Sequence, residues 1–382
     1  MPSFAKYNVW LCGYQGQILR PLFPGDDFVG MAWEHAVNDA GVYRLELVAE
    51  TATKDAFLVD YGVLVERDPG SGWYDEFYGF HLDSEERLES DRVDEHYWAS
   101  MGWSPEWVLD QPLLQPLVNA GNANWARYDT WWMHGAADDV VKAMASESCG
   151  PGVASVEGER AFSYLTVEGD ESQGAFDCYD DKYQRLLDAM RDVVGEDGQR
   201  GACDFRVVRT GSGFELRTYA PFFGTDRRKG TARPTIFSLD RGNMRNPVRR
   251  VIRHAEVTVA YGGWQGGGME RTIYERSNAA ALAESPWRRR EAFYDVRDVS
   301  TPDSIPGWLD QKLVDDGKRE EVEFTPVQTE ACLYGRDWWL GDLCTAELWG
   351  EEYDVRITGA AARIDGNVNE EIEGRAELWT RG

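Results

Sequence analysis

The sequence lacks several features that would identify a class of function. No apolar run reaches the roughly 18 residues of a membrane-spanning helix, so no membrane insertion is expected. Residues 1–6 show neither the basic nor the apolar part of a secretory signal. The six cysteines form no C-x-x-C pair and lie at no zinc-like spacing to the five histidines. We therefore expect reduced, buried thiols, with no disulfide scaffold, no metal site and no cofactor.

Catalytic motifs are also missing. There is no G-x-S-x-G and no H-x-x-x-H pair. The glycine-rich stretch 262–268 has neither a P-loop ending nor G-x-G-x-x-G spacing, which indicates a flexible connection or a hairpin tip. Residues 365–371 begin like a calcium loop, but Glu370 and Ala376 stand where an EF-hand needs Gly and Glu. The sequence of residues 365–371 therefore fits either a polar turn or an irregular cation site.

Lysine is scarce and acidic residues are abundant. The 382-residue chain has seven Lys against 33 Arg, and its 67 acidic residues give a formal net charge of -27. A net negative surface repels phosphates, so the composition excludes simple affinity for nucleic acid. The balance is typical both of a GC-rich genome and of a salt-adapted proteome, and the sequence does not separate these two causes.

What the chain does contain is a series of short strand-like segments bounded by Gly, Pro and Asp, with a hydrophobic fraction of 42% that can form a sizeable core. Residues 42–48 alternate with period two, which predicts a strand with one face on the core. Residues 204–208 and 214–219 predict a hairpin. Helical spacing predicts three helices, at 136–149, 179–194 and 305–316. The order of elements predicts an α+β fold that is mostly β, with more than one β-barrel-like unit.

Carboxylate pairs and aromatic clusters are candidate binding or catalytic groups. Glycoside hydrolysis needs two carboxylates flanking the scissile bond, but the sequence cannot choose a pair among 67 acids. Adjacent acids occur at Asp26–Asp27, Glu85–Glu86, Asp138–Asp139, Asp180–Asp181 and Glu351–Glu352. Aromatic clusters at 98–107 and 128–132 fit a core, a subunit contact, or a platform for sugar or peptide. The candidate contact residues are Trp98, Trp103, Trp107, Trp125, Trp131 and Trp132.

Arginines gather at three places in this acidic chain. A solvated face would account for them. Bidentate pairing with the carboxylates of a neighbouring subunit favours an interface instead. The candidate subunit-interface residues are Arg227, Arg228, Arg249, Arg250, Arg288, Arg289 and Arg290.

Several short motifs follow one another in an order that is itself informative. They include 38–47, 205–208, 213–216, 221–227, 237–243, 259–271, 289–297, 334–342 and 356–359. Residues 38–47 are similar to the pattern N-x-x-G-x-W-x-L-x-L, with Tyr43 in place of Trp, and Tyr334–Asp342 resembles Y-x-x-D-W-x-L-G-D. The ordered set resembles the Gp37-like siphovirus tail proteins, a family related to the tail hub or baseplate hub of long-tailed viruses.

This resemblance implies a virion structural protein that is not an enzyme. Hubs of this type are homotrimers whose chains each carry two β-barrel-like tube domains, giving a pseudo-six-fold ring. The implied domains are a first β tube domain at 1–100, a second at 203–245 with 320–382, and peripheral segments at 101–202 and 246–319. The ring would lie at the tail tip of a virion assembled in the host cytoplasm. It would join distal tail and tail-tube proteins to fibre or tip proteins and let DNA pass without specific binding.

Two other functions stay open at this point. A carbohydrate-binding or glycoside-hydrolysing protein would use the Trp/Tyr-rich patch and a carboxylate pair in a deep cleft. A salt-adapted intracellular enzyme would spread carboxylates over all exposed faces, whereas a DNA conduit needs them only along its pore.

Overall fold

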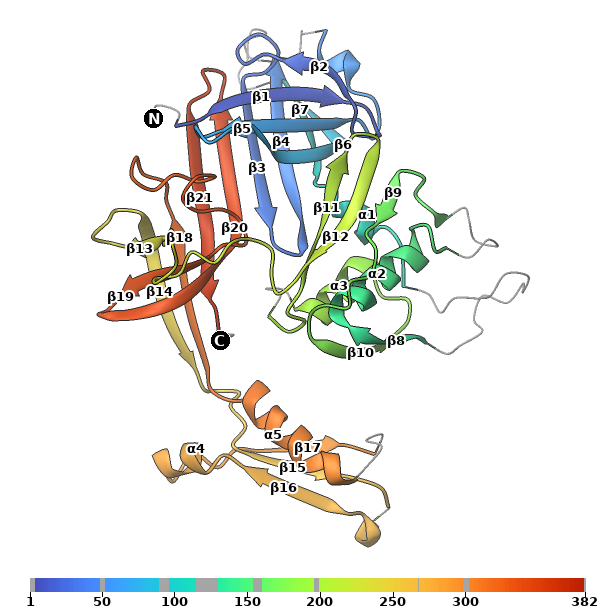
Figure 1. The fold of residues 1–382 in the computed structure, drawn as a ribbon, viewed down its shortest axis with the longest axis vertical. Coiled ribbons are helices and arrows are strands. Elements are labelled where there is room, and N and C mark those ends of the chain that lie inside the picture. The colour runs from blue at the N-terminus through green and yellow to red at the C-terminus, as the bar shows by residue number, and fades with distance from the viewer. Residues whose placement is uncertain are drawn as a thin grey trace, which may run out of the picture. The chain divides into compact units, whose positions relative to one another are not determined.

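The fold is mostly β, which confirms the predicted α+β class (Figure 1). The computed structural model describes residues 4–48, 52–88, 96–114, 130–153, 160–195, 199–266, 268–297 and 302–380. None of the helices in these ranges is long and apolar enough to cross a membrane. The chain divides into two compact units: Met1–Asn246 with Phe324–Gly382, here called the sheet unit, and Pro247–Glu323, here called the inserted unit.

The sheet unit is built on a 13-stranded sheet in which N-terminal and C-terminal strands share one ladder. Its path runs β14-β18-β21-β20-β3-β4-β7-β6-β5-β1-β2, while β19 pairs with both β20 and β13. Among the described residues no sheet closes into a barrel, so the expected barrel-like units take the form of an open sheet. The strands are β1 (Lys6–Cys12), β2 (Ile18–Leu22), β3 (Gly30–Ala36), β4 (Asp39–Val48), β5 (Gly62–Asp68), β6 (Tyr74–Leu88), β7 (His96–Trp103), β13 (Ile236–Ser238), β14 (Met244–Ile252), β18 (Arg319–Pro326), β19 (Leu343–Leu348), β20 (Glu351–Asp365) and β21 (Glu370–Leu378).

Strand β4 shows why the sequence forms this sheet. Tyr43, Leu45 and Leu47 are buried, whereas Val42 and Val48, on the opposite face, are exposed. Successive side chains of a strand point to opposite faces, so the alternation places one apolar row on the core. The strand predicted at 42–48 is confirmed.

Strand β5 is covered on both faces, and its sequence reflects this. Its residues Val63–Val65 are all fully buried, and a strand buried on both sides reads as a continuous apolar run. Leu64 belongs to the core cluster that also contains the helical part of the unit, so this part covers one face of β5.

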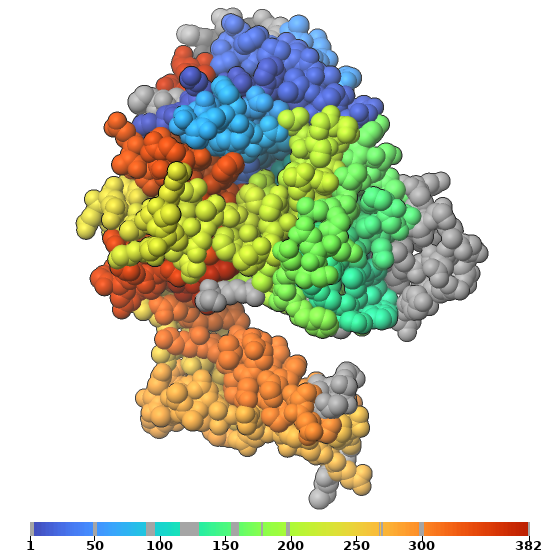
Figure 2. All heavy atoms as spheres, viewed as in Figure 1, coloured from blue at the N-terminus to red at the C-terminus, as the bar shows by residue number. Residues whose placement is uncertain are grey.

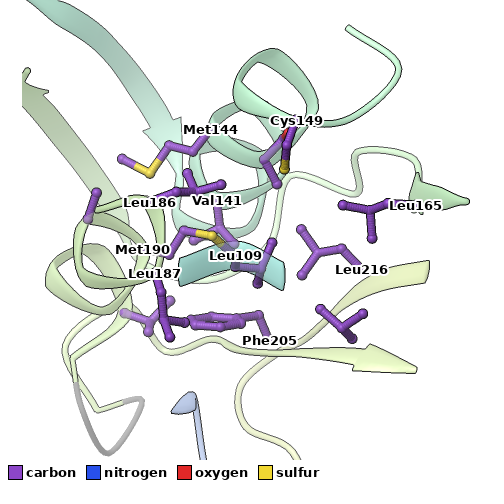
Figure 3. Packing of buried hydrophobic residues seen from close by; sticks show 14 of the residues in the cluster. Leu109, Val141, Met144, Cys149, Leu165, Leu186, Leu187, Met190, Phe205 and Leu216 are labelled. Atoms are coloured by element: carbon purple, nitrogen blue, oxygen red, sulfur yellow. The ribbon is translucent and has the colours of Figure 1, made fainter. Parts of the chain in front are cut away.

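Among the described residues, the helical part comprises three α-helices and two small sheets, and Figure 3 shows side chains of its buried core. Its elements are α1 (Trp107–Asp110), α2 (Ala137–Ser148), α3 (Leu186–Val194), the pair β8 (Trp131–Ala136) and β10 (Phe176–Asp181), and the three-stranded β9 (Leu165–Val167), β11 (Asp204–Thr210) and β12 (Gly213–Tyr219). Val141 and Met144 of α2, with Leu186 and Met190 of α3, lie in one buried cluster over Phe205 of β11. The predicted hairpin of β11 and β12 is confirmed.

The helix predicted over 179–194 is wrong at its start. Residues 176–181 form β10, which pairs with β8, and the helix begins only at Leu186. Tyr183 has φ of 59°, in the left-handed region that an α-helix cannot contain. The helical spacing of apolar residues thus begins at Tyr183, about one turn before the helix itself begins at Leu186.

The inserted unit is a three-stranded sheet covered by a helix. Its strands are β16 (Ile273–Ser277), β15 (Val259–Gly263) and β17 (Glu291–Asp295), in that spatial order, and its helices are α4 (Ala279–Glu284) and α5 (Ile305–Asp315). Leu309 of α5 packs so closely that a Cβ on Gly262 would lie 3.1 Å from its Cδ1 atom. Gly262 thus lies under the helix at the end of β15, and Gly263 pairs with Ile273 of the antiparallel β16.

Candidate assembly surface

The central strands of the large sheet have one buried face and one open face. On β3, Met31, Trp33 and His35 are buried, while Ala32 and Glu34 point the other way. The open face is defined here by the outward residues of β21, β20, β3 and β4. They are Glu371, Glu373, Ala361, Arg363, Ala32, Glu34, Val42 and Arg44, and they line a shallow hollow of about 380 Å³.

The strand register places these side chains in rows across the sheet. Antiparallel β20 and β3 pair from Gly359 opposite Ala36 to Asp365 opposite Gly30, which we call the β20–β3 junction. In Figure 1 this junction brings the red C-terminal strands beside the blue N-terminal ones. The hollow forms because small side chains lie at its centre, where Ala361 faces Glu34 and Ala32 faces Arg363.

The charge of the open face is mixed, with an acidic surplus. Glu34, Glu371 and Glu373 are exposed, against Arg363 and a half-buried Arg44. Arg44 donates from Nε to Glu46 at 3.0 Å and from Nη2 to Glu85 at 2.9 Å. The hydrogen bond from Arg44 lowers the pKa of Glu85. One of the two outward arginines thus has its charge satisfied within the sheet.

Behind the open face, a buried ion pair ties the two ends of the chain together. Arg67 of β5 and Glu370 of β21 are both fully buried, with Nη2 and Oε2 3.2 Å apart. Arg67 also donates to the Tyr334 carbonyl at 2.7 Å, and the Tyr7 hydroxyl donates to Glu370. Burial raises the pKa of Tyr7 well above its ordinary value, so the phenol stays protonated as a donor. This network fixes β1, β5 and β21 relative to one another.

A second buried pair joins the helical part to β20. Arg356 donates to Asp204 of β11, and both side chains are buried. Asn38, in the turn between β3 and β4, donates from Nδ2 to Asp204 at 2.8 Å and accepts from the Phe205 amide at 2.9 Å. Each charge has several partners, as a buried pair requires in order to offset the loss of water.

The motif at 334–342 has a structural role beside Ile357 of β20, just before β19 begins. Trp338 and Leu340 are buried, and Asp342 accepts from the amides of Thr225 and Trp339 at 2.7 and 2.9 Å. Arg227 donates from Nε to Asp342 at 2.6 Å. The final Asp of the motif therefore ties two loops to the entry of β19.

The seven predicted interface arginines all have partners within the chain. Their role in subunit contacts stays a prediction, because each guanidinium carries further donors beyond those used here. The partners are Asp342 for Arg227, Asp226 and Asp354 for Arg228, Glu320 for Arg249, Glu323 for Arg250, Glu256 for Arg288, Glu291 for Arg289, and the Arg253 carbonyl for Arg290.

The predicted aromatic contact patch is divided among different surroundings. Trp131 is buried in the core of the helical part, and Trp107 packs against the same cluster. Trp98 contacts Phe57 and His81, while Trp103 and Trp132 are 41% and 58% exposed. Trp125 lies outside the described residues. The described tryptophans therefore include two core residues, and their use as a contact patch stays a prediction.

The remaining sequence candidates have local roles. The carboxylate of Asp365 accepts from the amides of Asn367 and Asn369 at 2.8 and 2.9 Å, which makes a polar turn between β20 and β21. Buried Asp138 accepts from the Gln173 amide at 2.7 Å. Across the described ranges, no three His, Cys, Asp or Glu side chains are grouped so that they could hold a metal ion.

Sequence reasoning missed the buried residues that tie β1, β5 and β21 together. Arg67 and Glu370 are 303 positions apart, and nothing distinguishes them locally from the other arginines and acids. In the sequence, Glu370 is notable only as a mismatch in a calcium loop. The one usable signal is the position of Arg67 two residues after the apolar run that ends at Val65, where a charge faces the core.

An open β-sheet with peripheral insertions is the fold of phage tail proteins. The chain superposes on the tail protein from Neisseria meningitidis MC58, with TM-score 0.53 and 10% identity over 98% of this chain and 97% of that one. It also superposes on the prophage MuSo2 43 kDa tail protein from Shewanella oneidensis, with TM-score 0.53 and 10% identity over 98% of both chains. A prophage tail protein from Listeria monocytogenes EGD-e gives TM-score 0.51 and 9% identity, covering 98% of this chain and 95% of that one.

The family follows from the sequence itself. Residues 24–373 match the model of the Siphovirus ReqiPepy6 Gp37-like protein, so the chain belongs to that family. This confirms the resemblance carried by the ordered motifs. No curated protein matches the sequence. The chain is therefore a member of a siphovirus protein family and has the fold seen in phage tail proteins.

Proposed function

We propose that this chain is the tail hub, a non-catalytic homotrimer that forms a pseudo-six-fold ring at the tail tip. The observation that carries this proposal is the β20–β3 junction, through which one chain supplies two groups of strands to one continuous sheet. The first group is β1 to β7, and the second is β13, β14 and β18 to β21. The tube domains that we propose at 1–100 and at 203–245 with 320–382 contain most of these strands, although β11 and β12 lie in a separate sheet with β9 and β14 continues to Ile252.

Symmetry explains what such a chain can do. Three copies supply six groups of strands, and a closed ring of this kind matches six-fold proteins on one side and three-fold proteins on the other. The partners are then distal tail and tail-tube proteins above, and fibre or tip proteins below. The segments 101–202 and 246–319 are peripheral to the ring.

The open face is the surface that we assign to the channel. Its opposite side is already occupied by core residues such as Met31 and Trp33, so only the open face is available. Its surplus of Glu34, Glu371 and Glu373 repels phosphate groups. A weakly negative wall favours passage of DNA during ejection over retention, since phosphate binding depends on Lys and Arg contacts.

The ring is tested by mass photometry of the purified chain and by electron microscopy of the particles. We expect a species of about three times the 43.3 kDa chain mass, with an open pore in projection. A stable monomer that hydrolyses a polysaccharide would contradict the hub and support the glycosidase interpretation instead. A basic pore wall in the assembled ring would contradict only the role given to the open face.

A further inference from the structure

The sheet unit has another hollow, with a lining quite different from that of the open face. Its volume is about 640 Å³, and segments 233–236, 241–243 and 329–337 form most of it. Four arginines line it, against the single carboxylate of Asp337: Arg227, Arg233, Arg241 and Arg336. We call it the arginine pocket. In Figure 2 the chain around residues 220–240, in yellow-green, lies at the surface beside the orange and red C-terminal part.

Two of the four arginines have a carboxylate partner and two have none among the described residues. Arg227 is held by Asp342, and Arg336 donates from Nε to Asp337 at 3.0 Å. Arg233 and Arg241 are exposed, and neither side chain makes an ion pair or hydrogen bond with any residue that the structure describes. The pocket therefore holds two guanidinium groups whose positive charge is not neutralised.

This is unusual in a chain with so many carboxylates. Many other exposed arginines have an acidic partner, as Arg250 has with Glu323 and Arg276 with Asp310. Exposed Arg363 also lacks one among the described residues, but Arg233 and Arg241 line the same pocket. Two such arginines in one concave site indicate that an anionic group from outside the chain belongs there.

Hydrogen bonds within the chain hold the base of the pocket in place without a ligand. Buried Asn243 donates from Nδ2 to the Ile236 carbonyl and accepts from the Ser238 amide, both at 2.9 Å. The Thr235 hydroxyl donates to the Asp337 carbonyl, and the Thr235 carbonyl accepts from the Thr345 amide at 3.1 Å. A preorganised site loses less conformational entropy on binding than a flexible one.

We propose that the arginine pocket binds an acidic peptide segment of another protein chain. Guanidinium groups pair with carboxylates in a bidentate geometry, but one exposed pair contributes at most about 1 kcal/mol. Specific binding therefore needs several carboxylates at once, which a segment rich in Asp and Glu supplies. A nucleic acid is a poorer ligand because its affinity depends on many Lys and Arg contacts to phosphates, and this pocket offers only two arginines without a partner among the described residues.

The acidic segment has two possible sources, a second copy of this chain or a different tail protein. The chain itself carries exposed acidic stretches, such as Asp170–Glu171. Binding in the pocket does not require a trimeric ring. Loss of the ring and loss of peptide binding are therefore separate outcomes.

The pocket is tested with the full chain and a fluorescein-labelled peptide of alternating Glu and Gly, by fluorescence anisotropy at low salt. The variant Arg233→Glu with Arg241→Glu should weaken binding by at least about tenfold, because it replaces two attractive charges by two repulsive ones. The matched control is Arg276→Glu with Arg297→Glu, which makes the same change in net charge at exposed arginines of the inserted unit. The control should lose less than about threefold, because neither of its arginines lines the arginine pocket. Circular dichroism should show both variants folded.

Two results would overturn the proposal. One is an equal loss of affinity in the pocket variant and in the control, which would show that only net charge matters. The other is a duplex DNA probe that binds the wild-type chain as tightly as the peptide does. Sedimentation velocity then identifies the source of the segment. Self-association that disappears only in the pocket variant supports a second copy, whereas unchanged self-association with lost peptide binding supports a different tail protein.

Discussion

Two ion pairs, one from each unit of this chain, lie in very different surroundings. In the sheet unit, Arg67 and Glu370 are fully buried and join residues 303 positions apart. In the inserted unit, Arg276 and Asp310 are 45% and 50% exposed and lie 34 positions apart. Buried pairs are costly to break, because the remaining partner is left charged and out of water, whereas exposed pairs contribute little. The first pair thus holds distant strands together, whereas the second mainly solvates the surface.

The hydrophobic core of the sheet unit is also more extended than that of the inserted unit. The sheet unit has an extended cluster that runs from β1 through the three helices to β12. The core of the inserted unit has five buried residues, which are Ala260, Val296, Ile305, Leu309 and Leu313. A small core gives a smaller margin of stability. We therefore expect the inserted unit to open locally while the sheet unit stays folded.

The largest effect is expected from Arg67→Met. It leaves the carboxylate of Glu370 buried without its cation, which should cost the sheet unit about 3–5 kcal/mol in free energy of unfolding. The measurement is amide hydrogen exchange at β3 and β20 in the full chain. The control Arg363→Met, on the exposed face of the same sheet, should change exchange little. If the double variant Arg67→Met with Glu370→Met is no more stable than Arg67→Met, the unpaired charge is not the cause.

An intermediate effect, confined to the inserted unit, is expected from Leu309→Ala. Removing a fully buried leucine should cost about 2–5 kcal/mol, so exchange at β15 and β16 should rise by about a hundredfold. Exchange at β3 and β20 should stay at the wild-type rate. Val314→Ala, on the same helix but at a position 72% exposed, is the control. If Leu309→Ala accelerated exchange equally in both units, the two units would unfold together, and the inserted unit would not open by itself.

The smallest effect is expected from Arg276→Gln. The pair with Asp310 is exposed, so exchange in the inserted unit should stay within about fivefold of wild type, and the difference should vanish in 0.5 M salt. Arg288→Gln sharpens the test, because its partner Glu256 has only 4% of its side chain exposed. We expect a larger and less salt-sensitive change there. If Arg276→Gln changed exchange more than Arg288→Gln did, burial would not determine how strongly these pairs stabilise the unit.

Local periodicity predicted much of the secondary structure. The alternation at 42–48 and the helical spacing in α2 and α5 were sufficient because a side chain's face depends only on its neighbours in sequence. The failure at 179–185 has a local cause as well. Tyr183 adopts a left-handed conformation that residue type alone does not predict. The β20–β3 junction joins strands more than 300 residues apart, and no sequence pattern in either strand identifies the other as its partner.

The candidate surfaces were less predictable than the elements. The tryptophans were grouped by sequence proximity, but Trp131 and its neighbour Trp132 lie on opposite faces of β8, one buried and one exposed. The arginines were grouped by runs, whereas Arg233 and Arg241 lie outside these runs, line one pocket together and have no ion-pair or hydrogen-bond partner for their side chains within the described chain. That feature depends on where distant acids lie in space.

The β20–β3 junction has a consequence for how the protein is made. A ribosome releases β3 long before it has synthesised β20, and until then the outer edge of β3 exposes unpaired amides and carbonyls. An unpaired edge is a template for association with other chains. Only a chain translated through residue 365 can cover it. A chain that ends before β20 therefore leaves this edge of β3 uncovered and prone to association with other chains.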